Sequence, residues 1–324
     1  MRKLLRALYC TALFVAATAL AQTYPTHAIT LIVPFSAGGP TDTIARIMAE
    51  RMSRSLGESV IVENVTGAGG SIAVGKVARA APDGYTLGIG HIGTHVMIEA
   101  MQQQPFDVLR DLEPVGMIAI NPQIIVSKPG VPATNLKELV AWIKANENKV
   151  SQGTGGMGTP AHITGIYFQN MTGTKFEIVH YRGAAPAMQD LLAGHTDIMI
   201  DQAANSLPQV RAGKVKAYAV TAPTRLAAAP DIPTVDEAGV PGLHLAVWHG
   251  FWVPKATPKA VIAKLNAAMV EALADPAVQK RLVDLGQDIP ARDMQTPEGF
   301  GAFHKAQTDK WWPIIKSAGI KSEG

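Results

Sequence analysis

Apolar runs, glycine turns and helical patterns alternate through the first quarter of the chain. The apolar run "AITLIV" ends in a turn with two adjacent glycines, after which Ile44, Ile47, Met48 and Met52 recur at helical spacing. A second turn, "GAGGS", opens a helix of small residues that ends near Ala81. The three strands of this region are predicted at 28–33, 59–64 and 85–90. This order gives two βαβ units, which favour a parallel sheet with helices on its faces.

A second alternating series begins at Gln123, with strands and helices again taking turns. The predicted strands are 123–127, 176–181, 197–201 and 216–221, and the predicted helices are 135–146, 159–171 and 184–193. After Pro241 the pattern changes to an aromatic strand at 245–254 followed only by helices. A strand of this kind is expected to return to the first domain and cover its edge.

The two series predict an α/β fold with two domains that form a clamshell of the periplasmic-binding-protein type. We expect parallel-rich sheets and a ligand cleft between the domains. Domain 1 is predicted to contain residues 22–121 and 244–324, and domain 2 to contain 122–243. A length of 324 residues also favours two domains over a single core.

The N-terminal 21 residues have the pattern of a cleaved secretory signal. Arg2, Lys3 and Arg6 precede a short apolar stretch, and Ala19 and Ala21 have the spacing of a cleavage site. A membrane anchor is the alternative, but the uninterrupted apolar run is too short to span a bilayer. We therefore expect a periplasmic protein.

Removal of this segment changes the charge and the cysteine count. Lys and Arg fall from 29 to 26, because three lie in the leader, and 26 Asp and Glu balance them. A near-neutral chain gives no reason to expect nucleic-acid binding. The single cysteine, Cys10, is also in the leader, so disulfides, thiolate catalysis and cysteine-bound metals are excluded from the mature chain.

The first glycine turn, "PFSAGGPTD", lies between the end of a strand and the start of a helix, where α/β proteins bind ligands. Gly38 and Gly39 allow consecutive N–H groups to form an anion nest, and Thr41 or Asp42 is expected to cap the helix. The spacing matches no nucleotide-binding pattern, so a carboxylate fits better than a nucleotide. The alternative is a tight turn with an ordinary cap.

A similar turn, "SQGTGGMGTPAHIT", occupies residues 151–164 in the second half. It contains four glycines, and Thr154 and Thr159 offer hydroxyl donors. One such turn in each half suits an anion with two ends, although two unrelated glycine turns remain the alternative. The "GAGGS" turn is expected to allow close packing of a helix on the sheet rather than phosphate binding.

Histidines and serines offer candidates for chemistry without a complete motif. His91 and His95 have the spacing of two metal ligands on a helix, but their flanking glycines favour a strand end and a loop, where they would line a pocket or cap a helix. His162 either orients a carboxylate or satisfies buried backbone groups. Ser36 and Ser71 lie outside any G-x-S-x-G pattern. No catalytic residue, metal or cofactor is predicted.

Asp201 stands at the carboxyl end of the strand "DIMID". Its carboxylate either accepts a hydrogen bond from a ligand amine or hydroxyl, or caps the segment that follows, and the cap is favoured. The tryptophans near the C-terminus are expected to pack in the core or at a hinge; they are Trp248, Trp252, Trp311 and Trp312.

Longer segments carry a family resemblance. "YPTHAITLIVPFSAGGPTDTIAR", "VENVTGAGGSIAVGKVARAAPDGYTL", "HYRGAAPAMQDLLAGHTDIMID" and "AGKVKAYAVTAPTRLAAAPDIPTVDEAGVPG" occur in this order. With the C-terminal "TPEGF", they resemble the substrate-binding receptors of tripartite tricarboxylate transporters, the Bug family. The resemblance covers essentially the whole mature chain.

The resemblance implies a monomeric, non-enzymatic receptor that closes over a small carboxylate, without a cofactor, and delivers it to a membrane permease. It places ligand contacts in the first domain at Phe35, Ala37, Gly38, Gly39 and Asp42. In the second domain it places them at Thr154, Thr159, Pro160, Ala161 and His162. The strand end from His91 to Thr94, together with Asp201, is expected to complete the cleft.

Three segments depart from the family pattern where ligand identity is expected to be determined. Met157 stands in the second glycine turn, "GHIGTH" replaces a serine-rich stretch, and "VWHGFWVPKATP" is unusually bulky. These departures suggest an aromatic or partly apolar acid as ligand. The rival functions are a secreted hydrolase or lyase that uses His91, His95 or His162, and a periplasmic sensor subunit with the same cleft.

Overall fold

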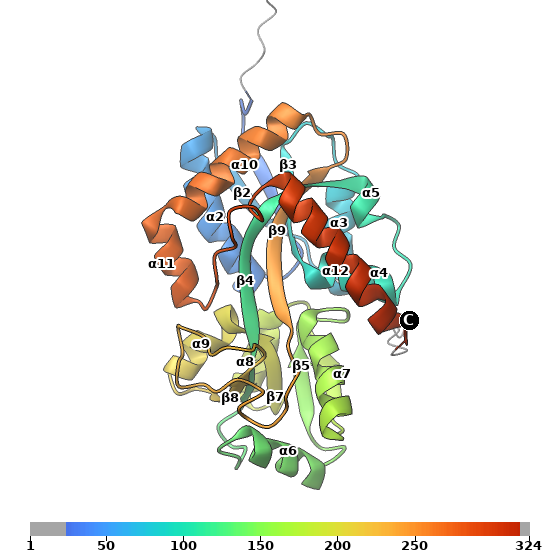
Figure 1. Cartoon of the computed structure of the whole chain (residues 1–324), viewed down its shortest axis with the longest axis vertical. Coiled ribbons are helices and arrows are strands. Elements are labelled where there is room, and N and C mark those ends of the chain that lie inside the picture. Colours follow the sequence, from blue (N-terminus) through green and yellow to red (C-terminus); the bar gives the residue numbers. More distant parts are fainter. Residues whose placement is uncertain (1–23, 318–324) are drawn as a thin grey trace, which may run out of the picture.

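The computed structural model describes residues 24–317, in nine strands and a set of helices (Figure 1). The predicted signal peptide and Cys10 lie outside these residues. The strands are β1 (Ile29–Val33), β2 (Val60–Asn64), β3 (Thr86–His91), β4 (Leu112–Ser127), β5 (Ser151–Thr154), β6 (Glu177–His180), β7 (Ile198–Gln202), β8 (Lys216–Val220) and β9 (Ala246–Pro254). The first helices are α2 (Pro40–Leu56), η1 (Ala68–Gly70), α3 (Ser71–Ala78), η2 (Gly93–Met97), α4 (Ile98–Met101) and α5 (Val108–Asp111). The later helices are α6 (Leu136–Ala145), α7 (Pro160–Thr172), α8 (Ala184–Ala193), α9 (Ala203–Arg211), α10 (Lys259–Ala274), α11 (Pro276–Asp284) and α12 (Pro297–Ser317).

The strands form a mixed sheet in the order β2-β1-β3-β9-β4-β7-β5-β6, and β8 also pairs with β4. The outer pairs β1–β2, β1–β3, β5–β6 and β5–β7 are parallel, as the βαβ pattern predicts. The pairs made by β4 and β9 in the centre are antiparallel. The predicted α/β fold is confirmed, and antiparallel central strands join its two parallel parts.

Strand β4 connects the two halves of the molecule (Figure 1). Residues 112–122 pair with β9, whereas 123–127 pair with β7 and β8. We call the half containing α2, α3, α10 and α12 the upper lobe, and the half containing α6–α9 the lower lobe. The domain boundary predicted between 121 and 122 falls inside this continuous strand and remains a prediction.

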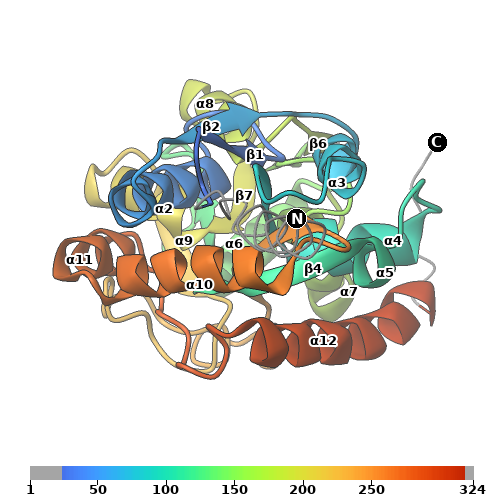
Figure 2. The same cartoon turned by 90° about the horizontal axis from the view of Figure 1, so that it is seen from above.

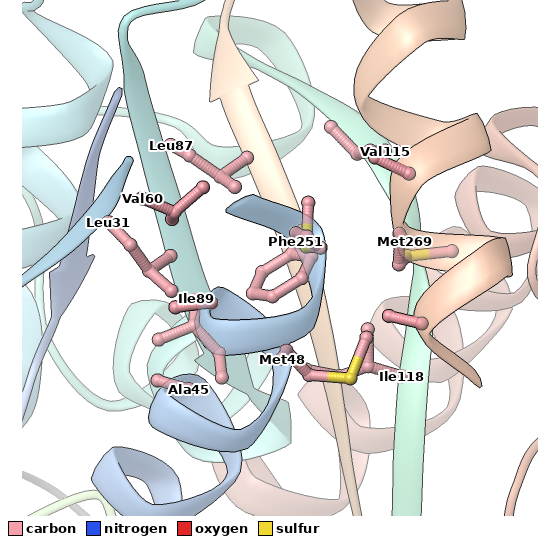
Figure 3. Packing of buried hydrophobic residues seen from close by; sticks show 14 of the residues in the cluster. Leu31, Ala45, Met48, Val60, Leu87, Ile89, Val115, Ile118, Phe251 and Met269 are labelled. Atoms are coloured by element: carbon pink, nitrogen blue, oxygen red, sulfur yellow. The ribbon is translucent and has the colours of Figure 1, made fainter. Parts of the chain in front are cut away.

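Helices cover both faces of the sheet in the upper lobe. Figure 2 shows α2, α10 and α11 on one side and α3, α4 and α12 on the other. Figure 3 shows part of the first core, where Leu31, Leu87 and Phe251 of the strands pack against Met48 of α2 and Met269 of α10. Full burial of each such side chain contributes about 1.5–3 kcal/mol. This core gives the first glycine turn a rigid base.

The lower lobe has the same layered arrangement. Side chains of α6 and α7 pack on one face of its strands, and side chains of α8 and α9 pack on the other. Within residues 24–317, no helix is both long and apolar enough to cross a membrane.

Candidate functional site

The first glycine turn connects β1 to α2. Gly38 has a φ of +80°, a conformation that favours glycine, and its N–H donates to Asp42 Oδ2 at 2.8 Å. The expected cap by Thr41 or Asp42 is wrong: the N-cap is Gly39, and both side chains lie in the first turn of the helix. Asp42 instead lies in the first turn of α2 and stabilises the glycine turn by accepting the Gly38 N–H.

The Asp42 carboxylate is an ionised group that hydrogen bonds within the upper lobe hold in place. It is buried and accepts hydrogen bonds from Arg46 Nε at 2.9 Å and from Asn64 Nδ2 at 2.9 Å. Burial raises the pKa of Asp42, but the donors Arg46, Gly38 and Asn64 together outweigh burial and hold that pKa below its usual value. The carboxylate therefore stays charged and fixes the turn.

The second glycine turn connects β5 to α7 and is stabilised by its own hydroxyls. Thr159 is the N-cap of α7, and its Oγ1 donates to Gly156 O at 2.6 Å. Thr154 Oγ1 lies 2.9 Å from His180 Nδ1 and accepts from the Gly156 N–H at 3.3 Å. The single hydroxyl proton of Thr159 is thus donated within the turn, and the Thr154 hydroxyl connects the turn to His180.

The two turns face one another across a small pocket that residues of both turns line. Six residues expected at the site line it: Phe35, His91, Thr159, Pro160, Ala161 and Asp201. The other expected residues do not: Ala37, Gly38, Gly39, Asp42, Thr94, Thr154 and His162. Sequence reasoning did not place Pro40, Thr41, Gln123, Gly155, Ala184 and Gln202 in the site, although they line the pocket as well.

Three helices begin at the pocket. Pro40 and Thr41 belong to the first turn of α2, Pro160 and Ala161 to that of α7, and Ala184 is the first residue of α8. The first N–H groups of a helix have no partner within it, and the helix dipole favours a negative guest there. No lysine or arginine is among the lining residues. Backbone N–H groups rather than cationic side chains would therefore hold an anion.

His91 forms part of the pocket wall as a neutral ring. Its Nδ1 accepts from the N–H groups of Gly93 at 3.0 Å and Thr94 at 3.3 Å, so the proton of the neutral ring is assigned to Nε2. Burial lowers the pKa of His91 to about 4. The ring stacks on Phe35 with centroids 5.0 Å apart. His91 therefore offers the site an N–H donor and an aromatic face.

Asp201 lies at the pocket on β7 and contacts the helix that follows. Its Oδ2 accepts from Asn205 Nδ2 at 2.7 Å and from Ser206 Oγ at 3.0 Å, both in α9. Burial raises the pKa of Asp201 to about 6, although these donors oppose the shift. The expected cap is wrong, because the N-cap of α9 is Gln202; Asp201 instead binds two side chains in the first turn of that helix.

The other candidate histidines have structural partners. His95 stacks on Trp252 with centroids 3.7 Å apart and does not line the pocket. His162 Nδ1 accepts from the Gly158 N–H at 3.2 Å, which supports the second turn, and burial lowers its pKa to about 4. Within residues 24–317, no group of three or more His, Cys, Asp or Glu side chains is placed to hold a metal ion.

The segments that depart from the family pattern contribute little to the pocket. Trp248 and Trp252 are buried in the core between β9 and α12. Met157 of the lower lobe lies against Gly69 of the upper lobe, because a Cβ added to Gly69 would lie 2.2 Å from Met157 O. His91 alone of "GHIGTH" lines the pocket. The bulk of these segments therefore fills the protein interior rather than enlarging the site.

The lobes touch around the pocket. The Ser36 N–H of the upper lobe donates to Arg182 O of the lower lobe at 3.2 Å. A Cβ on Gly158 would lie 2.6 Å from Ile98 Cδ1, and one on Gly93 would lie 2.8 Å from Pro160 Cδ. Glycines thus permit a close approach of the lobes, and the structure has the closed arrangement of a clamshell.

Comparisons with known proteins place this arrangement in a family. The profile of the tripartite tricarboxylate transporter family receptor matches residues 44–320. The structure of the periplasmic binding protein BugD is 40% identical, with a TM-score of 0.89 over 92% of this chain and 99% of that one. MatC from Rhodopseudomonas palustris with bound malate is 34% identical, with a TM-score of 0.87 over 90% and 100% of the two chains.

A further structure, R. palustris Rpa4515 with adipate, is 31% identical, with a TM-score of 0.87 over 92% of this chain and 99% of that one. BugD is a periplasmic binding protein, the other two proteins hold malate and adipate, and all three share the two-lobed fold described above. The predicted resemblance is therefore confirmed: the chain belongs to the tripartite tricarboxylate transporter family of receptors, and it is a solute-binding receptor of the Bug type rather than an enzyme.

Proposed function

We propose that this receptor binds a small carboxylate in the pocket between its lobes and delivers it to the membrane permease of a tripartite tricarboxylate transporter. The observation that carries the proposal is the convergence of three helix N-termini on a pocket lined by no lysine or arginine. Similar proteins with bound malate and adipate support the same ligand class.

The lining residues and the residues behind them have different proposed roles. Phe35, His91, Thr159, Pro160, Ala161 and Asp201 contact the ligand. The second group supports these contacts by holding the two turns and the His91 ring; it contains Ala37, Gly38, Gly39, Asp42, Thr94, Thr154 and His162. Rigid turns of this kind are preorganised for an anion, which lowers the entropic cost of binding.

We further propose that the receptor works in the periplasm as a monomer, after cleavage of residues 1–21. The basic and apolar N-terminal pattern supports secretion, and the family of the chain supplies the transporter as partner.

A thermal-shift screen tests the ligand class. The purified receptor is heated with mono-, di- and tricarboxylates, aromatic acids, amino acids and phosphate, and the ligand is recovered for mass analysis. A ligand at a hundred times its Kd adds about 2.7 kcal/mol to the free energy of unfolding. We expect stabilisation by at least one carboxylate, which is recovered unchanged. Stabilisation by phosphate alone, or by no carboxylate, contradicts the proposal.

A further inference from the structure

Gln123 is a fully buried polar side chain in the wall of the pocket. It lies on β4, directly beyond the stretch that pairs with β9, and its backbone N–H donates to Thr221 Oγ1 at 2.9 Å. Its side-chain Nε2 donates to Thr164 Oγ1 in α7 at 2.6 Å. Sequence reasoning did not single out this residue as a site residue, because it begins an otherwise apolar strand.

The hydrogen bonds around Thr164 determine which way the Gln123 amide points. Thr164 Oγ1 donates its only proton to Pro160 O at 2.8 Å, so this oxygen can only accept from Gln123. With the Thr164 proton assigned to Pro160 O, the amide is assigned with Nε2 toward Thr164. The remaining polar atom, Oε1, is buried and has no hydrogen-bond partner within residues 24–317.

An acceptor left without a partner in a protein interior destabilises the fold and calls for an explanation. Gln123 lines the same pocket as the N-termini of α2, α7 and α8, which supply donors. The pocket thus combines donors for a carboxylate with an acceptor that a carboxylate oxygen cannot satisfy. A hydroxyl or amine of a bound molecule provides the donor that Oε1 lacks.

We propose that Gln123 is a specificity-determining residue that selects carboxylates with a hydroxyl or amine donor over equally long carboxylates without one. This inference rests on the proposed carboxylate site and adds the class of ligand to it. A site with a buried hydrogen-bonding group discriminates against analogues that leave the group without a partner.

Calorimetric titration of matched ligand pairs tests the selection. The pairs are malate and succinate, aspartate and succinate, and citrate and tricarballylate, so that each pair differs by one donor group. For the pair of the preferred chain length, we expect the wild-type receptor to bind the donor-bearing member about tenfold more tightly. The malate and aspartate arms distinguish a hydroxyl from an amine as the donor.

Two variants connect the selection to Gln123. Gln123→Met removes the acceptor at similar volume, and we expect the affinity ratio to fall to about one through weaker binding of the donor-bearing member. Thr164→Val removes the hydroxyl that fixes the amide, and we expect it to lower the ratio in the same direction. If Gln123→Met does not fold, the affinity ratio of the wild-type receptor and that of Thr164→Val test the proposal.

Gln152 provides a matched control. It is also a buried glutamine whose Oε1 has no partner within residues 24–317, and its Nε2 donates to Ala161 O at 3.0 Å, but it does not line the pocket. Gln152→Met is expected to change both affinities by the same factor. Equal binding within every pair, or an unchanged ratio in Gln123→Met, overturns this inference alone. Failure to bind any carboxylate overturns the proposed function as well.

Discussion

Gly39 shows how a single position controls the gap between the lobes. Its φ of −78° and ψ of 172° are available to any residue, so glycine is not required there by the backbone. A Cβ would lie 3.4 Å from Ser36 O and 3.8 Å from the N atom of Ala185 in the opposite lobe. A larger side chain therefore fills the space in front of α8.

The first prediction is that Gly39→Val lowers carboxylate affinity at least tenfold and leaves the melting temperature nearly unchanged. The two γ-methyl groups obstruct the approach of α8 without straining the turn. Calorimetric titration and thermal melting measure the two effects. Gly130→Val, in a place where a Cβ meets no atom within 4 Å, serves as control and keeps its affinity. Equal affinities of Gly39→Val and the control would refute the prediction.

The second prediction concerns Asp42 and stability. Asp42→Ala leaves the Gly38 N–H without its acceptor and removes one of the two acceptors of Asn64 Nδ2, so we expect the free energy of unfolding to fall by about 1–3 kcal/mol. Urea denaturation at pH 7 measures this change. Because the pKa of Asp42 is lower in the folded state, its contribution is present above about pH 4 and is lost as the pH falls through the folded value. The difference from wild type should shrink at pH 3, and a constant difference speaks against this role.

At the scale of elements, β4 shows why the sequence predicted the fold class better than the strand boundaries. Only residues 123–127 were expected as a strand, whereas β4 begins at Leu112. Pro114, Gly116 and Pro122 interrupt the apolar pattern, and the register with β9 shifts near two of them. Pairing with β9, more than a hundred residues later, stabilises a strand that local propensity does not favour.

The helices show the same division between local and distant causes. α2, α7 and α8 were all predicted as helices, and α7 and α8 occur close to the expected bounds. The π-helix η2 was read as a loop, because its sequence "GTHVM" has no helical signal. Its residues are fixed instead by packing, since Trp312 Nε1 of α12 donates to Val96 O at 2.9 Å.

Buried histidines from β3, η2, β9 and α12 give a prediction at this scale. Burial lowers the pKa values of His91, His95, His249 and His304. The unfolded chain binds protons near pH 6.5, and the folded protein does not, so their contribution to stability is lost as the pH falls below about 6.5. The raised pKa values of Asp201, about 6, and Glu99, about 7, have the opposite effect.

The third prediction therefore isolates one histidine. His249 is fully buried, lies beside the His91 ring and has its Nε2 3.3 Å from Thr41 Oγ1. In His249→Gln, we expect the free energy of unfolding to decline less steeply between pH 7 and pH 5 than in wild type. Urea denaturation at several pH values measures the slope. Parallel curves for the two proteins would show that His249 is not responsible.

At the scale of the whole molecule, the site forms where distant segments meet. The family resemblance placed Phe35, His91 and the start of α7 at the pocket, and these residues lie at glycine turns or a strand end. Sequence reasoning did not place Gln123, Ala184 or Gln202 there, because no local pattern reveals which strands lie side by side. The closed lobes, with Ser36 hydrogen bonded to Arg182, also depend on contacts more than a hundred residues apart.

The central claim is that one small carboxylate binds between the lobes at three helix N-termini. The most direct test is a crystal structure of the receptor with the carboxylate that stabilises it most in the thermal-shift screen. We predict that the carboxylate group accepts hydrogen bonds from backbone N–H groups at the starts of α2, α7 or α8, with contacts from both lobes. A ligand bound outside this pocket, or touching one lobe only, would contradict the account.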